Sequence, residues 1–376
     1  RKGEVEMRVI LTGGITGGHI YPALAIADQF KEIDMDAEFL YLGSDEGMER
    51  YIVPKYGYDL KYIDSRWFDR SSPLKLAKTL FKNERGKRQA INVMKQFKPD
   101  LVVSTGSFVS VPVVLAAKAL KIPVYIHEQN AYPGVANKLL SKYARRVFLG
   151  FEAARKYFPS EKVVYTGNPV RNEFGEQDRN LARSELGIAQ DDFVVLIFGG
   201  SLGAETINDI GLAIINKYGD NSNVTILFGT GKDYYEQVNA RLKTGGKEVP
   251  ANVRLMPYIS EMAKMLSASN VIICRSGALS TAEVTMAGRA AIFIPSPNVT
   301  GDHQYYNAKA VADNGGAVLI TEGGDVELRV LNALKALRTD GTLLEEMEEG
   351  SYKSAPVDAA KIICDEIISD VKARRR

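Results

Sequence analysis

Apolar segments of strand length alternate with helix-like patterns along the whole chain. The apolar segments are continuous and rich in Val, Ile and Leu, which is typical of strands buried on both faces of a parallel sheet. This pattern predicts strands at residues 8–11, 38–41, 101–104, 124–127, 147–149, 163–166, 193–198, 224–228, 253–256, 271–274 and 291–294. Their alternation with helices predicts an α/β protein built from two Rossmann-like, doubly wound domains.

A domain boundary is expected at Gly167-Asn168-Pro169, a turn signal that follows a strand and precedes the charged, irregular stretch 171–192. The length of 376 residues agrees with two domains of roughly 150 residues each. We therefore expect an N-terminal domain over 7–168 and a C-terminal domain over 169–355, followed by a helix at about 356–371. Ligands of such sheets bind outside the carboxyl ends of the strands, so we expect the site in the cleft between the domains.

Composition and charge narrow the function further. The 48 basic and 46 acidic residues leave a net charge of +2, which is too balanced for a general nucleic-acid-binding protein. Cys274 and Cys364 are the only cysteines, which excludes a disulfide framework and a cysteine-based zinc site and fits a reducing cytoplasm. No segment approaches the ~18 apolar residues of a membrane helix. We expect no signal peptide, because Met7 fits as the natural start and the first strand follows at once.

A glycine-rich loop, residues 12–19, follows the first predicted strand and leads into a helix predicted at 22–30. Its glycines let backbone amides approach a phosphate or a sugar, and a helix N-terminus favours negative charge. The loop is not the dinucleotide fingerprint, because Ile15 or Thr16 stands where the middle glycine of that motif belongs. A plain strand-to-helix turn would also explain it. His19 ends the loop, at a place where a general base could serve.

The three histidines, His19, His127 and His303, each lie in or beside a strand-end loop. A zinc site made from the three gets no support from their spacing, so we expect no metal. The second candidate loop, residues 127–130, places four polar side chains (His-Glu-Gln-Asn) in a row at the end of a buried strand. A capped helix start is the alternative, but it does not explain why so many donors and acceptors gather there.

The second half of the chain carries three further candidate loops. Residues 199–204 repeat the glycine pattern and form a second candidate anion cradle, whereas residues 229–232 lack essential positions of a P-loop and indicate a turn. In residues 275–283, backbone amides could hold an anion or a uracil edge. Glu283, about a turn and a half into the following helix, could accept bonds from both hydroxyls of a ribose, although a solvated helical glutamate is the alternative. Residues 302–308 alone indicate a capped helix start.

Taken in this order, the five loops resemble the MurG family of bacterial glycosyltransferases. The motifs are His-Glu-Gln-Asn at 127–130, Gly-Asn-Pro-Val-Arg at 167–171 and Arg-Ser-Gly-Ala-Leu at 275–279, and the resemblance extends from Arg8 to about Asp370. It implies a GT-B fold whose C-terminal helix returns to the N-terminal domain. It also implies an inverting, metal-independent and cofactor-free transfer of N-acetylglucosamine from UDP-N-acetylglucosamine (UDP-GlcNAc) to the 4-hydroxyl of N-acetylmuramic acid (MurNAc) in lipid I, an undecaprenyl-linked acceptor. The product would be lipid II, for peptidoglycan synthesis.

The same resemblance assigns roles to individual residues. The implied substrate-binding residues are Thr16, Gly17, Gly18, Asn130, Arg171, Ser201, Ile259, Ala278, Leu279, Ser280, Thr281, Ala282, Glu283 and Gln304. Among them, Glu283 would hold the ribose and Ile259 the surroundings of uracil. Ser201 and Arg171 would hold the diphosphate, and Asn130 and Gln304 would contact the sugar. His19 would be the base, with Glu128 as the alternative base or as the residue that orients His19.

This sequence departs from the family pattern in three loops. Ile15 stands where a glycine is usual, Leu202 replaces a glutamine, and Ser107-Phe108 replaces a Gly-Tyr pair. We expect these departures to affect loop shape and acceptor contacts rather than donor identity, because none removes a charged group.

Residues 66–88 interleave basic side chains with large apolar ones and include Trp67, the only tryptophan. This composition suits a helix that lies on an anionic lipid surface. An ordinary amphipathic helix with a solvated basic face is the alternative. Because the implied acceptor carries a polyprenyl tail, the resemblance implies a peripheral enzyme on the cytoplasmic face of the cell membrane.

Other functions remain to be weighed against this one. A UDP-sugar epimerase or a lipid galactosyltransferase would share the fold, and the epimerase would turn over the UDP-sugar alone. A catalytically silent nucleotide-sugar sensor would bind UDP without transfer. The missing fingerprint argues against a nicotinamide oxidoreductase, and the charge balance argues against nucleic acid as a partner.

Overall fold

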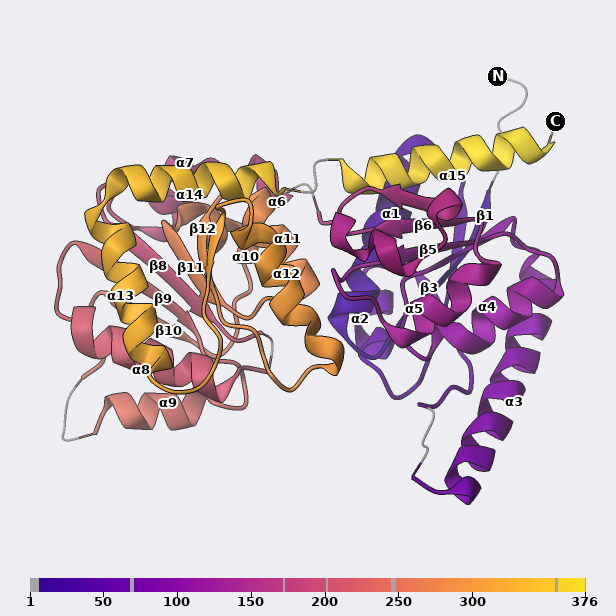
Figure 1. Ribbon diagram of the computed structural model, residues 1–376, viewed down its shortest axis with the longest axis horizontal. Helices are drawn as coiled ribbons and strands as arrows, with labels where there is room; N and C mark the ends of the chain where they lie inside the picture. The colour runs from indigo at the N-terminus through magenta and orange to yellow at the C-terminus, as the bar shows by residue number, and fades with distance from the viewer. Residues whose placement is uncertain are drawn as a thin grey trace. The chain divides into compact units, whose positions relative to one another are not determined.

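The computed structural model describes residues 7–67, 71–171, 173–200, 202–244, 248–355 and 358–375. The chain forms two compact units: unit 1 combines Arg1–Val170 with Asp358–Arg376, and unit 2 is Arg171–Val357 (Figure 1). Each unit contains one sheet in which every strand pair is parallel, with helices around it. The prediction of two Rossmann-like α/β domains is therefore confirmed.

Unit 1 is built on a seven-stranded sheet of order β3-β2-β1-β4-β5-β6-β7. The strands are β1 (Arg8–Thr12), β2 (Glu38–Gly43), β3 (Asp59–Tyr62), β4 (Leu101–Ser104), β5 (Val124–Glu128), β6 (Arg146–Leu149) and β7 (Val163–Tyr165). The helices are α1 (Gly17–Ile33), α2 (Glu49–Lys55), α3 (Pro73–Phe97), α4 (Ser110–Ala119), α5 (Val135–Leu140) and α15 (Ala359–Arg375), with 3₁₀ turns at Ser141–Tyr143, Glu152–Tyr157 and Ser160–Lys162. Val9 and Leu11 pack on one face with α1 and α15, and Ile10 packs on the other with α3 and α4.

Helix α15 belongs to unit 1 although it comes last in the sequence, and it lies alongside α1 (Figure 1). Ile363 and Ile367 are fully buried in the core below it. Near its end, Asp370 accepts a hydrogen bond of 2.6 Å from the Tyr125 hydroxyl and pairs with Arg145 at 2.6 Å. These two donors lower the pKa of Asp370. The helix is therefore held by both packing and charge.

Unit 2 is built on a six-stranded sheet of order β10-β9-β8-β11-β12-β13. Its strands are β8 (Phe193–Phe198), β9 (Val224–Gly229), β10 (Val253–Met256), β11 (Val271–Cys274), β12 (Ala290–Phe293) and β13 (Ala317–Leu319). Its helices are α6 (Glu173–Glu176), α7 (Arg179–Leu186), α8 (Glu205–Tyr218), α9 (Tyr235–Leu242), α10 (Met262–Ala268), α11 (Ala278–Met286), α12 (His303–Ala312), α13 (Val326–Thr339) and α14 (Gly341–Lys353), with a 3₁₀ turn at Thr300–Asp302.

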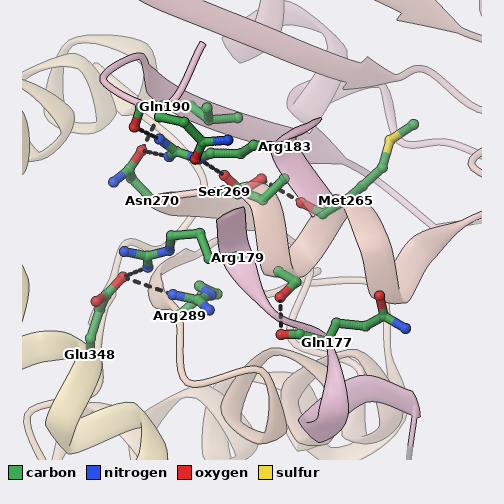
Figure 2. A network of polar contacts seen from close by, with 12 residues as sticks. Gln177, Arg179, Arg183, Gln190, Met265, Ser269, Asn270, Arg289 and Glu348 are labelled. Atoms are coloured by element: carbon green, nitrogen blue, oxygen red, sulfur yellow. Dashed lines mark hydrogen bonds and ion pairs between the residues drawn. The ribbon is translucent and has the colours of Figure 1, made fainter. Parts of the chain in front are cut away.

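A polar network closes the end of unit 2 at which β8 and β11 begin (Figure 2). Arg183, 3% exposed, donates to the Ala268 carbonyl at 2.9 Å, the Gln190 carbonyl at 2.6 Å and Asn270 Oδ1 at 2.8 Å. Next to it, Glu348 on α14 pairs with Arg179 and with Arg289. The buried Arg183 has three hydrogen-bond acceptors, and Arg179 and Arg289 share the Glu348 carboxylate, so this end of unit 2 is structural.

The structure differs from the sequence prediction in five elements: α1, β3, β13, α6 and α7. Helix α1 begins at Gly17 rather than at residue 22, so Pro22 lies inside it. The edge strands β3 and β13 were not predicted, and the stretch expected to be irregular contains the short helices α6 and α7. The structure contains no helix, over its described residues, that is long and apolar enough to cross a membrane.

Candidate active site

The carboxyl ends of β1, β4 and β5, which are neighbours in the sheet of unit 1, carry the first group of polar residues. His19 is the third residue of α1, directly after the glycine-rich loop. Its ring nitrogen Nδ1 lies 2.9 Å from the carbonyl oxygen of Thr105, in the loop after β4. A carbonyl can only accept, so Nδ1 carries the proton and Nε2 of the neutral ring keeps its lone pair. This is the form that a general base needs.

Thr105 also ties the glycine-rich loop to the start of α1. Its hydroxyl lies 2.5 Å from the carbonyl oxygen of His19 and 3.2 Å from that of Thr12. Gly13 makes this contact feasible, because a Cβ there would lie only 2.1 Å from the Thr105 hydroxyl oxygen. Thr105 was not among the residues predicted from the sequence. Its signal was its place directly after the predicted strand 101–104, at the edge where ligands bind.

Replacing Gly13 with alanine is expected to lower turnover about tenfold. The added methyl group displaces Thr105, and the Thr105 carbonyl then no longer holds His19, for which a misplacement of about 1 Å is costly. Steady-state turnover measured at saturating substrates tests this. Gly134→Ala is the matched control, since its Cβ would meet nothing closer than 3.9 Å. Equal turnover in the two variants would contradict the expectation.

Ile15 adopts φ +73°, a left-handed conformation that is unfavourable for a β-branched residue. The loop is held in this shape from both sides. The Ile15 N–H donates to Glu49 Oε2 at 2.8 Å, and the Ile15 carbonyl accepts from the Met48 N–H at 3.3 Å. Glu49 is fully buried, and its other oxygen accepts from the Ser44 N–H at 2.8 Å. This clamp, which sequence reasoning missed, explains how isoleucine replaces the usual glycine here.

Glu128 is buried at the end of β5, and its carboxylate accepts four hydrogen bonds. Oε1 accepts from the backbone N–H and the side-chain amide of Asn130, at 3.0 and 3.2 Å. Oε2 accepts from the Gly134 N–H at 3.1 Å and from the Asn137 side chain at 2.9 Å. Glu128 therefore holds the loop that presents Asn130, and both of its oxygens are already engaged.

In unit 2, the loops after β8 and β9 touch each other through glycines. A Cβ on Gly203 would lie 2.2 Å from the Thr230 carbonyl oxygen, and one on Gly231 would lie 2.2 Å from the Gly203 nitrogen. Both glycines have positive φ, so no other residue fits this approach. Beside them, Ile259 is 7% exposed and packs over Gly229. Ser201 lies outside the described residues.

Residues 278–283 form the first part of α11, which begins after Gly277. Glu283 is partly buried, and desolvation raises its pKa to about 7, an effect that Arg171 opposes and Glu173 reinforces. Arg171 is half-exposed and pairs with Glu173 at 2.7 Å. Within the described residues, no side chain caps the N-terminal N–H groups of α1, α8 or α11. These helix ends can therefore offer N–H groups to an anion.

Gln304 lies in the first turn of α12 and is fixed by its surroundings. Its side-chain oxygen accepts from the Ser296 N–H at 2.9 Å, and its carbonyl accepts from the Ser276 hydroxyl at 2.8 Å. Asn307 in turn donates to the Ser276 carbonyl at 3.2 Å. The loops after β11 and β12 are thus joined, and these hydrogen bonds fix the orientation of the Gln304 side-chain amide.

The structure therefore assembles the predicted residues into two groups, one in each unit. Unit 1 brings together Thr16, Gly17, Gly18, His19, Glu128 and Asn130 on the loops at the carboxyl ends of β1 and β5. Unit 2 brings Ile259, Gln304 and the run Ala278–Glu283 to the carboxyl edge of its own sheet, with Arg171 near Glu283. Over the residues that the structure describes, no three His, Cys, Asp or Glu side chains gather in a way that could hold a metal ion.

Two parallel α/β units with glycine-rich loops at their strand ends define a glycosyltransferase of the GT-B class. Residues 9–149 match the glycosyltransferase family 28 N-terminal domain and residues 194–363 the glycosyltransferase family 28 C-terminal domain. The chain belongs to glycosyltransferase family 28, and within it to the MurG family that its loops resemble.

Relatives and solved structures agree with this assignment. The UDP-N-acetylglucosamine--N-acetylmuramyl-(pentapeptide) pyrophosphoryl-undecaprenol N-acetylglucosamine transferase of Caldicellulosiruptor saccharolyticus is 38% identical over 95% of this chain and 96% of its own length. The crystal structure of Acinetobacter baumannii MurG is 32% identical, covers 96% of this chain and 99% of its own, and has a TM-score of 0.76. A UDP-GlcNAc 2-epimerase from Neisseria meningitidis, 16% identical with a TM-score of 0.68 and coverage of 97% and 100%, shares the fold alone.

Proposed function

We propose that this protein transfers N-acetylglucosamine from UDP-GlcNAc to the 4-hydroxyl of MurNAc in lipid I, giving lipid II for peptidoglycan synthesis. The main support for the proposal is the geometry of His19, which lies at a sheet edge with its Nδ1–H bound to the Thr105 carbonyl and its Nε2 lone pair available to accept a proton. The printed names of relatives such as that of Caldicellulosiruptor saccharolyticus supply the donor and the acceptor.

In unit 1, His19 Nε2 removes the proton of the MurNAc 4-hydroxyl. The hydroxyl oxygen then forms a bond to the anomeric carbon of N-acetylglucosamine, on the face opposite to UDP, so the configuration inverts. We choose His19 over Glu128 as the base, because both oxygens of Glu128 already accept hydrogen bonds within their own loop. Glu128 acts by holding Asn130, which contacts the donor sugar together with Gln304.

In unit 2, the bond between the anomeric carbon and the phosphate oxygen breaks, and UDP leaves with the electron pair. We propose that no metal assists this step. The N–H groups at the start of α8 and α11, with Arg171 and Ser201, neutralise the diphosphate. Ile259 lines the uracil, and Glu283 accepts hydrogen bonds from the ribose hydroxyls. The phosphate and sugar contacts are completed by Thr16, Gly17 and Gly18 of the glycine-rich loop.

Transfer of radiolabelled N-acetylglucosamine from UDP-GlcNAc to a short-chain lipid I analogue, with EDTA present, tests the proposal. Labelled lipid II analogue is the expected product. Its absence while UDP still binds would leave a nucleotide-sugar binder or another acceptor. Conversion of UDP-GlcNAc alone to its 2-epimer would indicate the epimerase instead.

Affinity for UDP-GlcNAc is expected to rise between pH 6 and pH 8. The pKa of Glu283 is about 7, so its carboxyl group is mostly protonated at pH 6 and ionised at pH 8, when it accepts best from the ribose hydroxyls. Calorimetry at the two pH values measures the change in affinity. The diphosphate diester itself does not titrate in this range, so it does not contribute to the change. Glu283→Gln should bind about tenfold more weakly at pH 8 and lose the pH dependence, since a hydrogen bond to a charged group contributes about 1.5 kcal/mol. A pH dependence that persists in Glu283→Gln would exclude this carboxyl as its source.

We further propose that unit 1 docks on the cytoplasmic face of the membrane through residues 66–88. Trp67, Leu74 and Phe81 are exposed by 62, 86 and 73% of their surfaces. The N-terminal half of α3, which carries Leu74 and Phe81, extends away from the sheet of unit 1 (Figure 1). Phe68, Asp69 and Arg70 of this segment lie outside the described residues. Exposed apolar side chains among lysines suit the surface of an anionic bilayer. The enzyme has to reach this surface, because the polyprenyl tail of the acceptor lies in the membrane.

A further inference from the structure

Behind His19 lies a hydrogen-bonded chain of side chains to which the reaction above assigns no part. His127 lies in β5 and Gln129 directly follows this strand, and the two side chains are in hydrogen-bond contact. His127 is fully buried, and Gln129 is 2% exposed. The chain runs from the Gly167 carbonyl through His127 and Gln129 to His19, and all four residues belong to unit 1.

The direction of each hydrogen bond is set by backbone carbonyls, which can only accept. His127 Nε2 lies 3.2 Å from the Gly167 carbonyl oxygen, so Nε2 carries the proton of this ring. Burial lowers the pKa of His127 to about 4, so the ring is neutral near pH 7 and its Nδ1 is an acceptor. That acceptor lies 3.0 Å from Nε2 of Gln129.

The orientation of the Gln129 amide follows from the same reasoning. Its Nε2 lies 3.1 Å from the His127 carbonyl oxygen as well as close to His127 Nδ1, so two acceptors take its two hydrogens. The amide oxygen then faces Nδ1 of His19 at 3.2 Å. Flipping the amide would set its oxygen against the His127 carbonyl and its N–H groups against the N–H of His19. Both contacts would be repulsive.

We propose that Gln129 is a positioning residue for His19, whose amide oxygen holds the imidazole in its Nδ1-protonated tautomer. This inference rests on the proposed role of His19 as the base. The Thr105 carbonyl and the Gln129 oxygen accept from the same N–H, so His19 is held by two acceptors that directly follow the neighbouring strands β4 and β5. The amide oxygen also stabilises the imidazolium that forms when Nε2 takes a proton, because a hydrogen bond to a charged group is stronger than one to a neutral group. The Thr105 carbonyl is part of the backbone, which leaves Gln129 as the partner that substitution can remove.

Nitrogen-15 NMR of the full chain labelled at histidine tests the proposal without any activity assay. The chain has three histidines, and His19→Gln and His127→Phe spectra assign two of them. We expect the Nδ1–H form for His19 and the Nε2–H form for His127 at pH 7. An Nε2–H form for His19, or an Nδ1–H form for His127, would overturn the proposal even if the transferase activity is as proposed.

Gln129→Met is the variant that keeps side-chain length and removes the amide. Only the Thr105 carbonyl is then left to accept from Nδ1 of His19, so we expect the share of the Nε2–H tautomer to rise above that of the wild-type protein. We expect kcat to fall about tenfold, with KM for UDP-GlcNAc unchanged. Gln89→Met is the matched control, because Gln89 also makes two side-chain hydrogen bonds in unit 1, to the backbone and the carboxylate of Asp64, away from His19. Unchanged tautomer signals in Gln129→Met, or an equal loss of kcat in the control, would reject the positioning role. Failure of the transferase proposal would show instead as inactive wild-type protein with the NMR result intact.

Discussion

Replacing His19 with alanine is expected to lower turnover by about 10²–10⁴-fold, the range of a lost general base. The imidazole is held by the Thr105 carbonyl at 2.9 Å, which leaves Nε2 as the basic nitrogen. Without it, the acceptor hydroxyl must lose its proton to water. UDP binding should stay nearly unchanged, because the uridine and diphosphate contacts that we assign lie on unit 2 and on the backbone of the glycine-rich loop.

Three measurements separate this loss from a folding defect. Circular dichroism should give the wild-type spectrum and Tm, since His19 is only partly buried. Calorimetry should give the wild-type affinity for UDP. Added imidazole should restore part of the turnover, because it can enter the space that the side chain left. Near-normal turnover in His19→Ala would remove His19 from the role of base and return Glu128 to consideration.

The strands of the buried sheet centres could be predicted because their side chains face apolar layers on both sides. Strand β8 at Phe193–Phe198 and β11 at Val271–Cys274 were predicted with the bounds that the structure gives. Strand β3 was missed because it is an edge strand whose residues Asp59–Tyr62 are mostly exposed and largely polar. Strand β13 was missed because it has three residues and also lies at an edge. The edge strands β7 and β10 were predicted because their residues are mostly apolar, so it is the polarity of β3 and the shortness of β13 that hid these two.

The start of α1 was placed too late because residues 17–19 were assigned to the glycine-rich loop. The helix begins at Gly17 and tolerates Pro22 in its interior. This correction matters for the site, because it puts Gly17, Gly18 and His19 inside the first turn. The N–H groups of Gly17 and Gly18 therefore point along the helix axis towards any bound anion, whereas the His19 N–H donates to the Thr16 carbonyl at 3.1 Å.

The site residues that could be predicted from the sequence, such as His19 and Glu283, are titratable side chains at strand-end loops or at the helix starts that follow them. Thr105 and Glu49 act through contacts between distant segments, and so does Gln129, whose candidate loop was predicted but whose contact with His19 was not. Thr105 meets His19 across 86 residues of sequence, and Glu49 meets Ile15 across 34. Such pairings depend on strand order and register, which a single sequence does not state. Their side chains alone look like ordinary loop and helix residues.

Neutralising Lys75, Lys78 and Lys82 together, each to Gln, is expected to weaken binding to vesicles that contain phosphatidylserine by about 10²-fold. Each lysine near an anionic surface contributes about 1 kcal/mol, and three contribute about 3 kcal/mol. Leu74, Lys78 and Phe81 are spaced by four and three residues on α3, so a basic and two apolar side chains share one face of the helix. Further along, Arg85 pairs with Asp64, and Lys87 and Arg88 pair with Glu84, so these bases are partly neutralised already.

Co-sedimentation with vesicles, with and without phosphatidylserine, measures the effect. Lys243, Lys335 and Lys353, all exposed on unit 2, changed together to Gln, form the matched control with the same change in net charge. Binding of the wild-type protein should weaken as salt is raised, because ions screen the attraction to the lipid headgroups. Phe81→Ser should weaken binding to both kinds of vesicle, since it removes apolar area rather than charge. If the α3 and control triple variants bind equally well, the α3 segment does not face the membrane, and the ordinary amphipathic helix is the correct interpretation.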